Sequence, residues 1–219
     1  MMDTMQNYDI QPMPRLNEPA PEFEADTTFG HIRLSDFRGK WVVMYSHPAD
    51  FTPVCTTEFM GFSARKKEFD EMNVQLLGLS IDSVFSHLAW VNSIQKDFGQ
   101  HTPFPIIADL DMHVSKLYGM IHPKAATTQA VRALFIIDPE GILRLMIYYP
   151  MTTGRNIDEV IRVLKSLQTV DQYKVNTGAN WQPGDPVIVS PPNTVKSLDE
   201  RSAQKDVDCK AWYFCTKKL

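Results

Sequence analysis

Residues 48–55 constrain the fold of this chain more than any other segment. They read Pro-Ala-Asp-Phe-Thr-Pro-Val-Cys and follow an apolar run at residues 41–45. Thr52 suits the N-cap of a helix and Pro53 its first position, so Cys55 falls at the third helical position. Its sulfur then faces unpartnered backbone N–H groups at the positive end of the helix dipole, which favours thiolate over thiol. The segment therefore predicts a strand, a tight loop and a helix that carries a nucleophilic cysteine.

Composition and charge exclude several classes of function. The 219 residues are 43% hydrophobic, enough for one sizeable core with an extension, and carry a formal net charge of -4. No long basic cluster is present, so neither nucleic acid nor an anionic membrane is an expected partner. The sequence shows no apolar run of transmembrane length and no secretory pattern at its start, which predicts a soluble, cytoplasmic protein. Glycine-rich nucleotide loops and the H-E-x-x-H motif are also absent from the sequence, so no cofactor and no metal are expected.

Apolar runs alternate with amphipathic segments over residues 1–170. Strands are expected at residues 31–34, 41–45, 74–80, 104–109, 131–137 and 142–148, the last two joined by a turn at 138–141. Helices are expected after Cys55, with a face of Phe59, Phe62, Lys66 and Phe69, then from Ser83 to about 98, at 112–118, and from about 157. The alternation predicts an α/β domain in which helices cover a sheet.

Residues 171–219 are rich in Gly, Pro and Asn and show no strong periodicity, which indicates an extension and not an independent core. Cys209 and Cys215 lie near its end with aromatic residues between them. Three cysteines are too few for a secreted disulfide framework and fit redox chemistry in a reducing compartment better. The segment with Cys209 and Cys215 fits either an inert, disordered tail or a segment that docks through its aromatic residues. A zinc site is less well supported, because two cysteines with no nearby histidine supply too few ligands.

The residues around Cys55 resemble the peroxidatic motif of the peroxiredoxins, the AhpC/TSA family. The resemblance rests on Pro48-x-x-x-Thr52-x-x-Cys55 within the longer match at residues 50–58, and extends to residues 19–23, 132 and 148–156. Residues 46–48 and the long extension resemble the peroxiredoxin six type, and the late cysteine pair resembles its archaeal and bacterial members. The resemblance covers nearly the whole chain. It implies a thioredoxin-like fold, a central mixed sheet flanked by helices at residues 1–170, with a C-terminal extension at 171–219.

The resemblance also implies a role for each motif residue. Cys55 would attack peroxide and become a sulfenic acid, a displacement that needs an activated nucleophile and fixed donors. The Thr52 hydroxyl would hydrogen-bond the peroxide, and Arg132 would stabilise the thiolate and orient the substrate through its fork of donors. Pro48 would shield the sulfur without adding a competing N–H. On spacing alone Arg132 fits a surface salt bridge equally well.

Further residues receive supporting roles from the same resemblance. Glu58 is expected to hold the arginines, Arg155 to be a second cation near the pocket, and His47 to lie close to the sulfur. His47 also fits a plain hydrogen-bond partner beside a strand end. The histidines at 31, 87, 101, 113 and 122 show no pattern in the sequence.

Cys215 is expected to resolve the sulfenic acid as a disulfide with Cys55, reaching across from a neighbouring subunit, with Cys209 as the alternative. The implied activity is a thiol-dependent peroxidase acting on hydrogen peroxide and small organic hydroperoxides, re-reduced by a thioredoxin-like dithiol protein. The resemblance implies a homo-oligomer of dimers in a decameric or dodecameric ring. A ring-forming holdase and a peroxide sensor that oxidises a partner are the competing functions. Residues 34–41 contain no serine elbow, so phospholipase activity is not expected.

Overall fold

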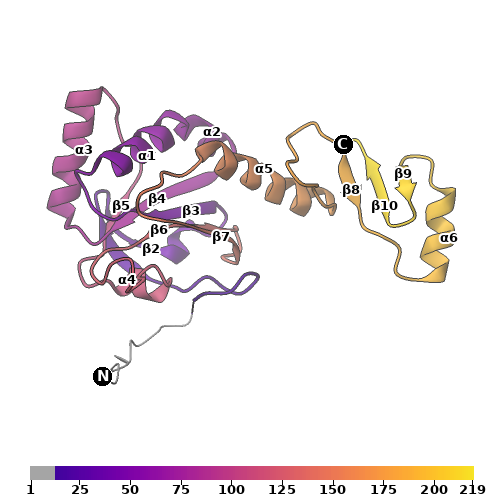
Figure 1. Ribbon diagram of the computed structural model, residues 1–219, viewed down its shortest axis with the longest axis horizontal. Coiled ribbons are helices and arrows are strands. Elements are labelled where there is room, and N and C mark those ends of the chain that lie inside the picture. The colour runs from indigo at the N-terminus through magenta and orange to yellow at the C-terminus, as the bar shows by residue number, and fades with distance from the viewer. Residues whose placement is uncertain (1–12) are drawn as a thin grey trace, which may run out of the picture. The chain divides into compact units, whose positions relative to one another are not determined.

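The computed structural model describes residues 13–219, which divide into two compact units. The first unit ends at Ile157 and the second begins at Asp158 (Figure 1). The division falls earlier than the expected boundary at residue 170, which lies inside helix α5 (Ile157–Tyr173). Each unit has its own sheet.

The first unit is built on a seven-stranded sheet in the order β2-β1-β5-β4-β3-β6-β7. Its strands are β1 (Glu24–Thr27), β2 (Gly30–Arg33), β3 (Trp41–Ser46), β4 (Val74–Ser80), β5 (Ile106–Ala108), β6 (Arg132–Ile137) and β7 (Leu143–Tyr149). Its helices are η1 (Leu34–Phe37), α1 (Pro53–Ala64), α2 (Lys66–Glu71), α3 (Val84–Phe98) and α4 (His113–Leu117).

Strand β3 lies in the interior of the sheet, and all six of its residues are buried. Such a run of β-branched and aromatic residues is typical of a strand that is covered on both faces. It pairs in parallel with β4 and antiparallel with β6, and β4 pairs in parallel with β5. The sheet is therefore mixed, as expected.

Helices cover both faces of this sheet: α1, α2 and α3 lie on one side and α4 on the other (Figure 1). On the first side, Phe59 and Phe62 of α1 pack against Tyr45 of β3, with ring centroids 5.3 and 4.2 Å apart. On the second side, Met44 shares a core cluster with Val114 and Tyr118. The alternation of side chains along β3 thus supplies both layers of the core.

Most predicted elements of this unit are confirmed. The clearest is α3, which begins after Ser83, whose hydroxyl accepts a hydrogen bond of 3.2 Å from the Ser86 N–H. The single helix predicted after Cys55 is wrong, because the chain leaves helical geometry at Arg65 (φ -101°, ψ 6°) and α2 follows as a separate helix. The sequence does not predict strand β1, because its four residues, which follow the Pro-rich segment at 17–23, are too few to show a period.

The second unit contains more regular structure than its composition predicts. After α5 it forms β8 (Val187–Val189), α6 (Val195–Ala203), β9 (Asp208–Ala211) and β10 (Phe214–Lys217), with the strands in the order β8-β10-β9. A small core of Val175, Trp181 and Val187 lies beside this sheet's first strand. Strands of three or four residues are too short to show a period, so the sequence does not predict them.

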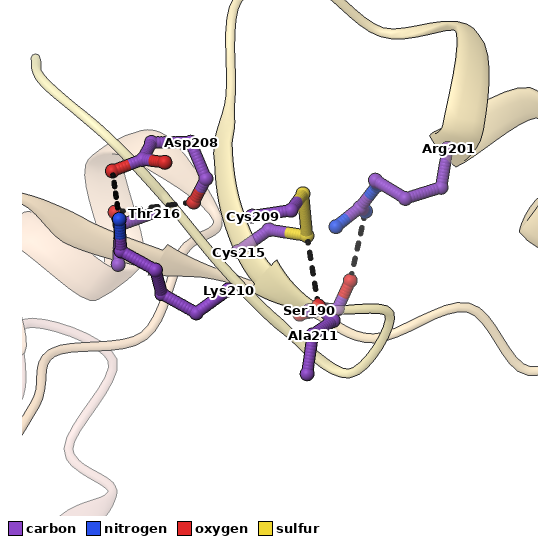
Figure 2. Close-up of a disulfide and its surroundings, with 8 residues drawn as sticks. All are labelled: Ser190, Arg201, Asp208, Cys209, Lys210, Ala211, Cys215 and Thr216. Carbon is purple, nitrogen blue, oxygen red and sulfur yellow. Dashed lines mark hydrogen bonds and ion pairs between the residues drawn. A yellow bond between two sulfur atoms is a disulfide. The ribbon is translucent and has the colours of Figure 1, made fainter.

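The late cysteines are bonded to each other across the last two strands. Cys215 of β10 is in register with Cys209 of β9, and their sulfurs form a disulfide (Figure 2). This pairing was not among the expectations from the sequence.

Among the described residues, 13–219, no helix has the length and apolar character needed to cross a membrane.

Candidate active site

Three segments that are distant in the sequence meet at one end of the central strands of the large sheet. Strand β3 ends at Ser46 and leads through residues 47–52 into α1. Strand β6 runs antiparallel to β3, so its first residue, Arg132, lies beside the end of β3. Arg132 is also in register with Tyr149, the last residue of β7, after which the chain continues to Arg155. The topology therefore brings α1, Arg132 and Arg155 together.

Cys55 is the third residue of α1 and is fully buried. Thr52 is the N-cap residue and Pro53 the first helical residue, as predicted. The Thr52 hydroxyl does not cap the helix, however; it donates to the Ala49 carbonyl at 2.9 Å. Its oxygen keeps lone pairs that can accept a hydrogen bond from a ligand. Pro48, on the loop before the helix, is buried as well.

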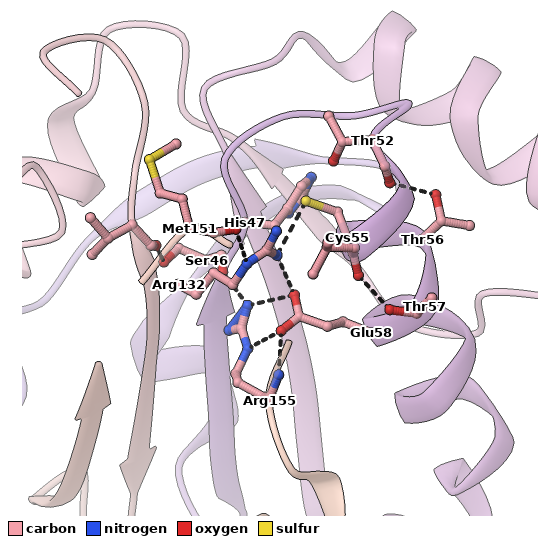
Figure 3. Close-up of polar contacts among 12 residues, drawn as sticks. Ser46, His47, Thr52, Cys55, Thr56, Thr57, Glu58, Arg132, Met151 and Arg155 are labelled. Atoms are coloured by element: carbon pink, nitrogen blue, oxygen red, sulfur yellow. Dashed lines mark hydrogen bonds and ion pairs between the residues drawn. The ribbon is translucent and has the colours of Figure 1, made fainter. Parts of the chain in front are cut away.

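Arg132 lies directly against the Cys55 sulfur. Its Nη1 is 3.3 Å from Cys55 Sγ and 2.6 Å from Glu58 Oε2, while its Nε donates to the Met151 carbonyl at 2.8 Å (Figure 3). The residue is 2% exposed, so it is not a surface salt bridge. The Arg132 guanidinium is thus held by the Met151 carbonyl and the Glu58 carboxylate, and it still directs an N–H group at the Cys55 sulfur.

Glu58 joins Arg132 to Arg155. The backbone N–H and Nε of Arg155 each donate to Glu58 Oε1 at 2.9 Å, and its Nη2 donates to Oε2 at 3.0 Å. The guanidinium also donates to the carbonyls of Ser46 at 2.5 Å and Ala133 at 3.1 Å. Glu58 lies one helical turn after Cys55, so the same helix sets the position of the sulfur and of the carboxylate.

The charges of this cluster are unequal. Two guanidinium groups, Arg132 and Arg155, surround the one carboxylate of Glu58, and all three side chains are at least nine-tenths buried. A buried charge without a partner is costly. An anion beside Arg132 would compensate the surplus positive charge, and the atom that lies there is the Cys55 sulfur.

A second buried network lies behind the loop before α1. Asp50 Oδ1 is 2.9 Å from His47 Nε2, and Asp50 Oδ2 is 2.8 Å from His87 Nδ1. His87 Nε2 also lies 3.1 Å from the Ile107 carbonyl. His87, which shows no pattern in the sequence, therefore belongs to this buried hydrogen-bond network. Its partner Asp50 is distant in sequence, so no spacing rule could have found it.

This network fixes the protonation of His47. Burial lowers the pKa of His47 below its ordinary value of 6.5, and the hydrogen bond to Asp50 opposes this only in part. Burial alone would raise the pKa of Asp50, but the hydrogen bonds from His47 and His87 outweigh it and hold this pKa well below its usual range. His47 is thus a neutral imidazole beside a carboxylate. Its Nδ1 is buried and has no hydrogen-bond partner among the described residues.

His47, Asp50 and His87 also place three possible metal-ligand atoms within 4.8 Å of one another. The nitrogen–oxygen distances of 2.8 and 2.9 Å, however, are those of hydrogen bonds, with each facing nitrogen as the donor. The carboxylate is already shared by two imidazoles. The residues therefore fit a hydrogen-bond network better than a metal site.

The remaining predicted site residues, Cys209 and Cys215, belong to the second unit. Cys215 is fully buried and Cys209 is exposed, and their sulfurs are bonded to each other. Cys55 is the one free cysteine among residues 13–219.

We expect the free energy of unfolding to fall as the pH is lowered from about 7 to about 5. The unfolded chain protonates His47 near its ordinary pKa, whereas the folded protein keeps it neutral because burial lowers that pKa, so protons bind the unfolded state preferentially. Urea unfolding at several pH values measures the slope. His47→Gln keeps a donor for Asp50 but cannot titrate, so its slope should be smaller; an unchanged slope would rule out His47 as the cause.

Comparison with known proteins agrees with this geometry. Residues 16–146 match the AhpC/TSA family, and residues 166–203 match the C-terminal domain of 1-Cys peroxiredoxin. Peroxiredoxin 2 of Caldanaerobacter subterraneus subsp. tengcongensis is 58% identical over 210 residues, which cover 94% of each chain. The peroxiredoxin of Methanosarcina mazei is 50% identical over 215 residues, 94% of this chain and 98% of that protein.

Solved structures show the same relationship. A yeast mitochondrial 1-Cys peroxiredoxin superimposes with a TM-score of 0.85 at 40% identity, covering 94% of this chain and all of that one. Peroxiredoxin 6 of Arenicola marina, solved as a cysteine-to-serine mutant, gives 0.84 at 36% identity, covering 94% and 99%. The chain therefore belongs to the AhpC/TSA family of thiol peroxidases, as a peroxiredoxin of the peroxiredoxin six type with a 1-Cys-type C-terminal domain.

Proposed function

We propose that the chain reduces hydrogen peroxide and small organic hydroperoxides at Cys55, with the late cysteines completing the cycle. The observation that carries the proposal is the 3.3 Å contact between Arg132 Nη1 and the Cys55 sulfur, inside a buried cluster with surplus positive charge. A nucleophile needs such activation, and a fixed cation beside it stabilises the negative charge of the reaction.

In the first step the Cys55 thiolate attacks one peroxide oxygen. An S–O bond forms and the O–O bond breaks, and sulfur is oxidised by two electrons. The proton of the attacked oxygen passes to the leaving oxygen, which becomes water or an alcohol, and solvent protonates the resulting sulfenate to the sulfenic acid. Arg132 orients the peroxide oxygens through its donors. The Thr52 oxygen accepts a hydrogen bond from the peroxide, because its own hydroxyl hydrogen is donated to the Ala49 carbonyl. Pro48 shields the sulfur on the loop side.

In the second step the Cys215 thiol attacks the Cys55 sulfenic acid, releasing water and forming a Cys55–Cys215 disulfide. Cys209 then attacks the Cys215 sulfur, which frees Cys55 and leaves Cys209 bonded to Cys215. The pairing of these two strand neighbours supports the last exchange. We place Cys215 on a neighbouring subunit, where the exposed Trp212 and Tyr213 beside it offer a contact surface.

A thioredoxin-like dithiol protein is the proposed reductant, because a disulfide is opened by an attacking thiolate and the exposed Cys209 is the accessible sulfur. The related yeast structure is described in terms of thiol resolution through glutathione and thioredoxin systems. A cycle that depends on such a reductant fits a reducing compartment, so we propose a cytoplasmic location.

Peptide mapping of the full chain tests the cycle. The protein is first reduced, then treated with one equivalent of hydrogen peroxide and trapped with acid. Wild type should yield the Cys209–Cys215 disulfide, and Cys209→Ser should accumulate the Cys55–Cys215 disulfide, because the exchange that frees Cys55 is blocked. In Cys215→Ser the sulfenic acid should persist or oxidise further.

Cys55→Ser is the matched control. Any disulfide that peroxide produces in this variant should form more slowly than in wild type. If wild type shows no oxidation at Cys55, the peroxidase proposal fails. If Cys215→Ser still forms the Cys55 disulfide at the wild-type rate, Cys209 is the resolving residue. Oxidation that passes at once to a different protein would favour the sensor, and client protection that survives Cys55→Ser would favour the holdase.

We further propose that two copies pair through strand β7, as the first step towards a ring. The two edges of the large sheet differ: β2 is four residues long and carries His31 and Arg33, whereas β7 is seven residues long, mostly apolar and half-buried. A long apolar edge strand is a site for pairing with another chain, and charged short edges prevent it.

Sedimentation equilibrium of the full chain tests this pairing. Wild type should have at least twice the chain mass of 25.0 kDa. Ile147→Lys on β7 should weaken the assembly, because a charge blocks an edge, while His31→Lys on β2 should leave it intact. A wild-type particle of 25.0 kDa would contradict the proposal.

A further inference from the structure

Tyr45 lies in the core of the sheet but also borders the charged cluster. Its ring lies under the guanidinium of Arg155, whose Cζ is 5.1 Å from the ring centroid. Its other neighbours are apolar: Phe62 stacks on it at 4.2 Å, and Phe59 packs at 5.3 Å. Tyr45 is therefore the aromatic residue through which the core reaches the cluster around Cys55.

The hydroxyl of Tyr45 does not explain its position. This group is fully buried and has no hydrogen-bond partner among the described residues. Burial raises the pKa of Tyr45 well above its ordinary value, so the side chain stays a neutral phenol. An unpartnered buried hydroxyl costs free energy, so the favourable part of the residue is its ring.

The hydrogen bonds of Arg155 leave the faces of its guanidinium uncovered. Nε, Nη1 and Nη2 donate to Glu58, Ala133 and Ser46, and such bonds lie close to the guanidinium plane. They fix the group within that plane but resist movement across it poorly. An aromatic ring at 5.1 Å covers one face, excludes water from it and attracts the cation, and this attraction is strongest where the pair is desolvated.

We propose that Tyr45 is a positioning residue of the peroxidase site: its ring holds Arg155 against Glu58, which in turn holds Arg132 beside the Cys55 sulfur. The ring carries no net charge, so its direct effect at the sulfur is small. Arg155 carries a full charge, and a displaced Arg155 leaves the Glu58 carboxylate free to compete with the thiolate for Arg132. The inference rests on the proposed role of Cys55 as the nucleophile.

The test is the second-order rate constant for the first turnover with hydrogen peroxide, measured by stopped flow. Tyr45→Phe keeps the ring and removes only the unpartnered hydroxyl, so its rate should stay within about twofold of wild type, and its unfolding midpoint should be equal or higher. Tyr45→Leu should lower the rate about threefold to tenfold, the kinetic equivalent of losing one buried cation–π contact.

Phe69→Leu is the cavity control. Phe69 is fully buried and contacts Phe62, so its loss opens the same aromatic layer away from Arg155. It should lower stability as Tyr45→Leu does, but leave the rate near that of wild type. A rate loss equal to that of Tyr45→Leu would reduce the role of Tyr45 to packing.

Fluorinated phenylalanines at position 45 provide the readout that packing does not move. Each added fluorine weakens the attraction of the ring for a cation while changing its shape little, so the rate should fall stepwise along the series. A flat series in a protein whose wild type consumes peroxide would overturn the inference alone. A wild type that does not consume peroxide at Cys55 would instead overturn the proposed function.

Discussion

The two ion pairs that Glu58 makes with Arg132 and Arg155 are the interaction on which the site depends. Both carboxylate oxygens are used, one mainly by each arginine, and the three side chains are buried. Breaking a buried ion pair by removing one partner typically costs about 3–5 kcal/mol, because a charge is left without compensation. The same arrangement leaves one positive charge in excess, next to a sulfur 3.3 Å away. The contacts that stabilise the cluster are therefore the same contacts that, in the proposed mechanism, activate the sulfur.

The fold makes this cluster possible by bringing separate segments to one end of the central strands. Helix α1 supplies Cys55 and Glu58, the start of β6 supplies Arg132, and the segment after β7 supplies Arg155. Ser46, the last residue of β3, ties these parts together: its hydroxyl donates to the Val131 carbonyl at 2.5 Å and accepts from the Ala133 N–H at 3.0 Å. The antiparallel pairing of β3, β6 and β7 is thus a requirement of the chemistry as well as of the core.

Local sequence signals predicted the parts of the structure that depend on near neighbours. Ser83 marked the start of α3, the run at 74–80 gave β4, and Thr52 with Pro53 placed Cys55 at the third position of α1. Contacts between distant residues left no such signal. The bond between Asp50 and His87 joins residues 37 apart, and the contact of Tyr45 with Arg155 depends on the register of the sheet. The resemblance to peroxiredoxins supplied Arg132 and Glu58, which spacing alone did not.

The second unit shows a different limit. Its strands are short and its composition resembles a loop, so neither the small sheet nor the Cys209–Cys215 bond could be read from periodicity. The bond follows from the pairing of β9 with β10, which places the two residues opposite each other. This register supports the proposed exchange, in which Cys209 takes Cys215 from Cys55 and releases Cys55 for another turnover.

The most direct test of the account is the rate of the first turnover with hydrogen peroxide in Arg132→Lys, compared with wild type and with the double variant Cys209→Ser/Cys215→Ser. A lysine keeps the charge but cannot contact the sulfur, Glu58 and Met151 together, so the rate should fall by about 100-fold, as when a fixed donor is lost from a reacting centre. The double variant should keep the wild-type rate, because its substitutions affect only later steps. An Arg132→Lys protein that reacts as fast as wild type would contradict the claim that this buried charge cluster activates Cys55.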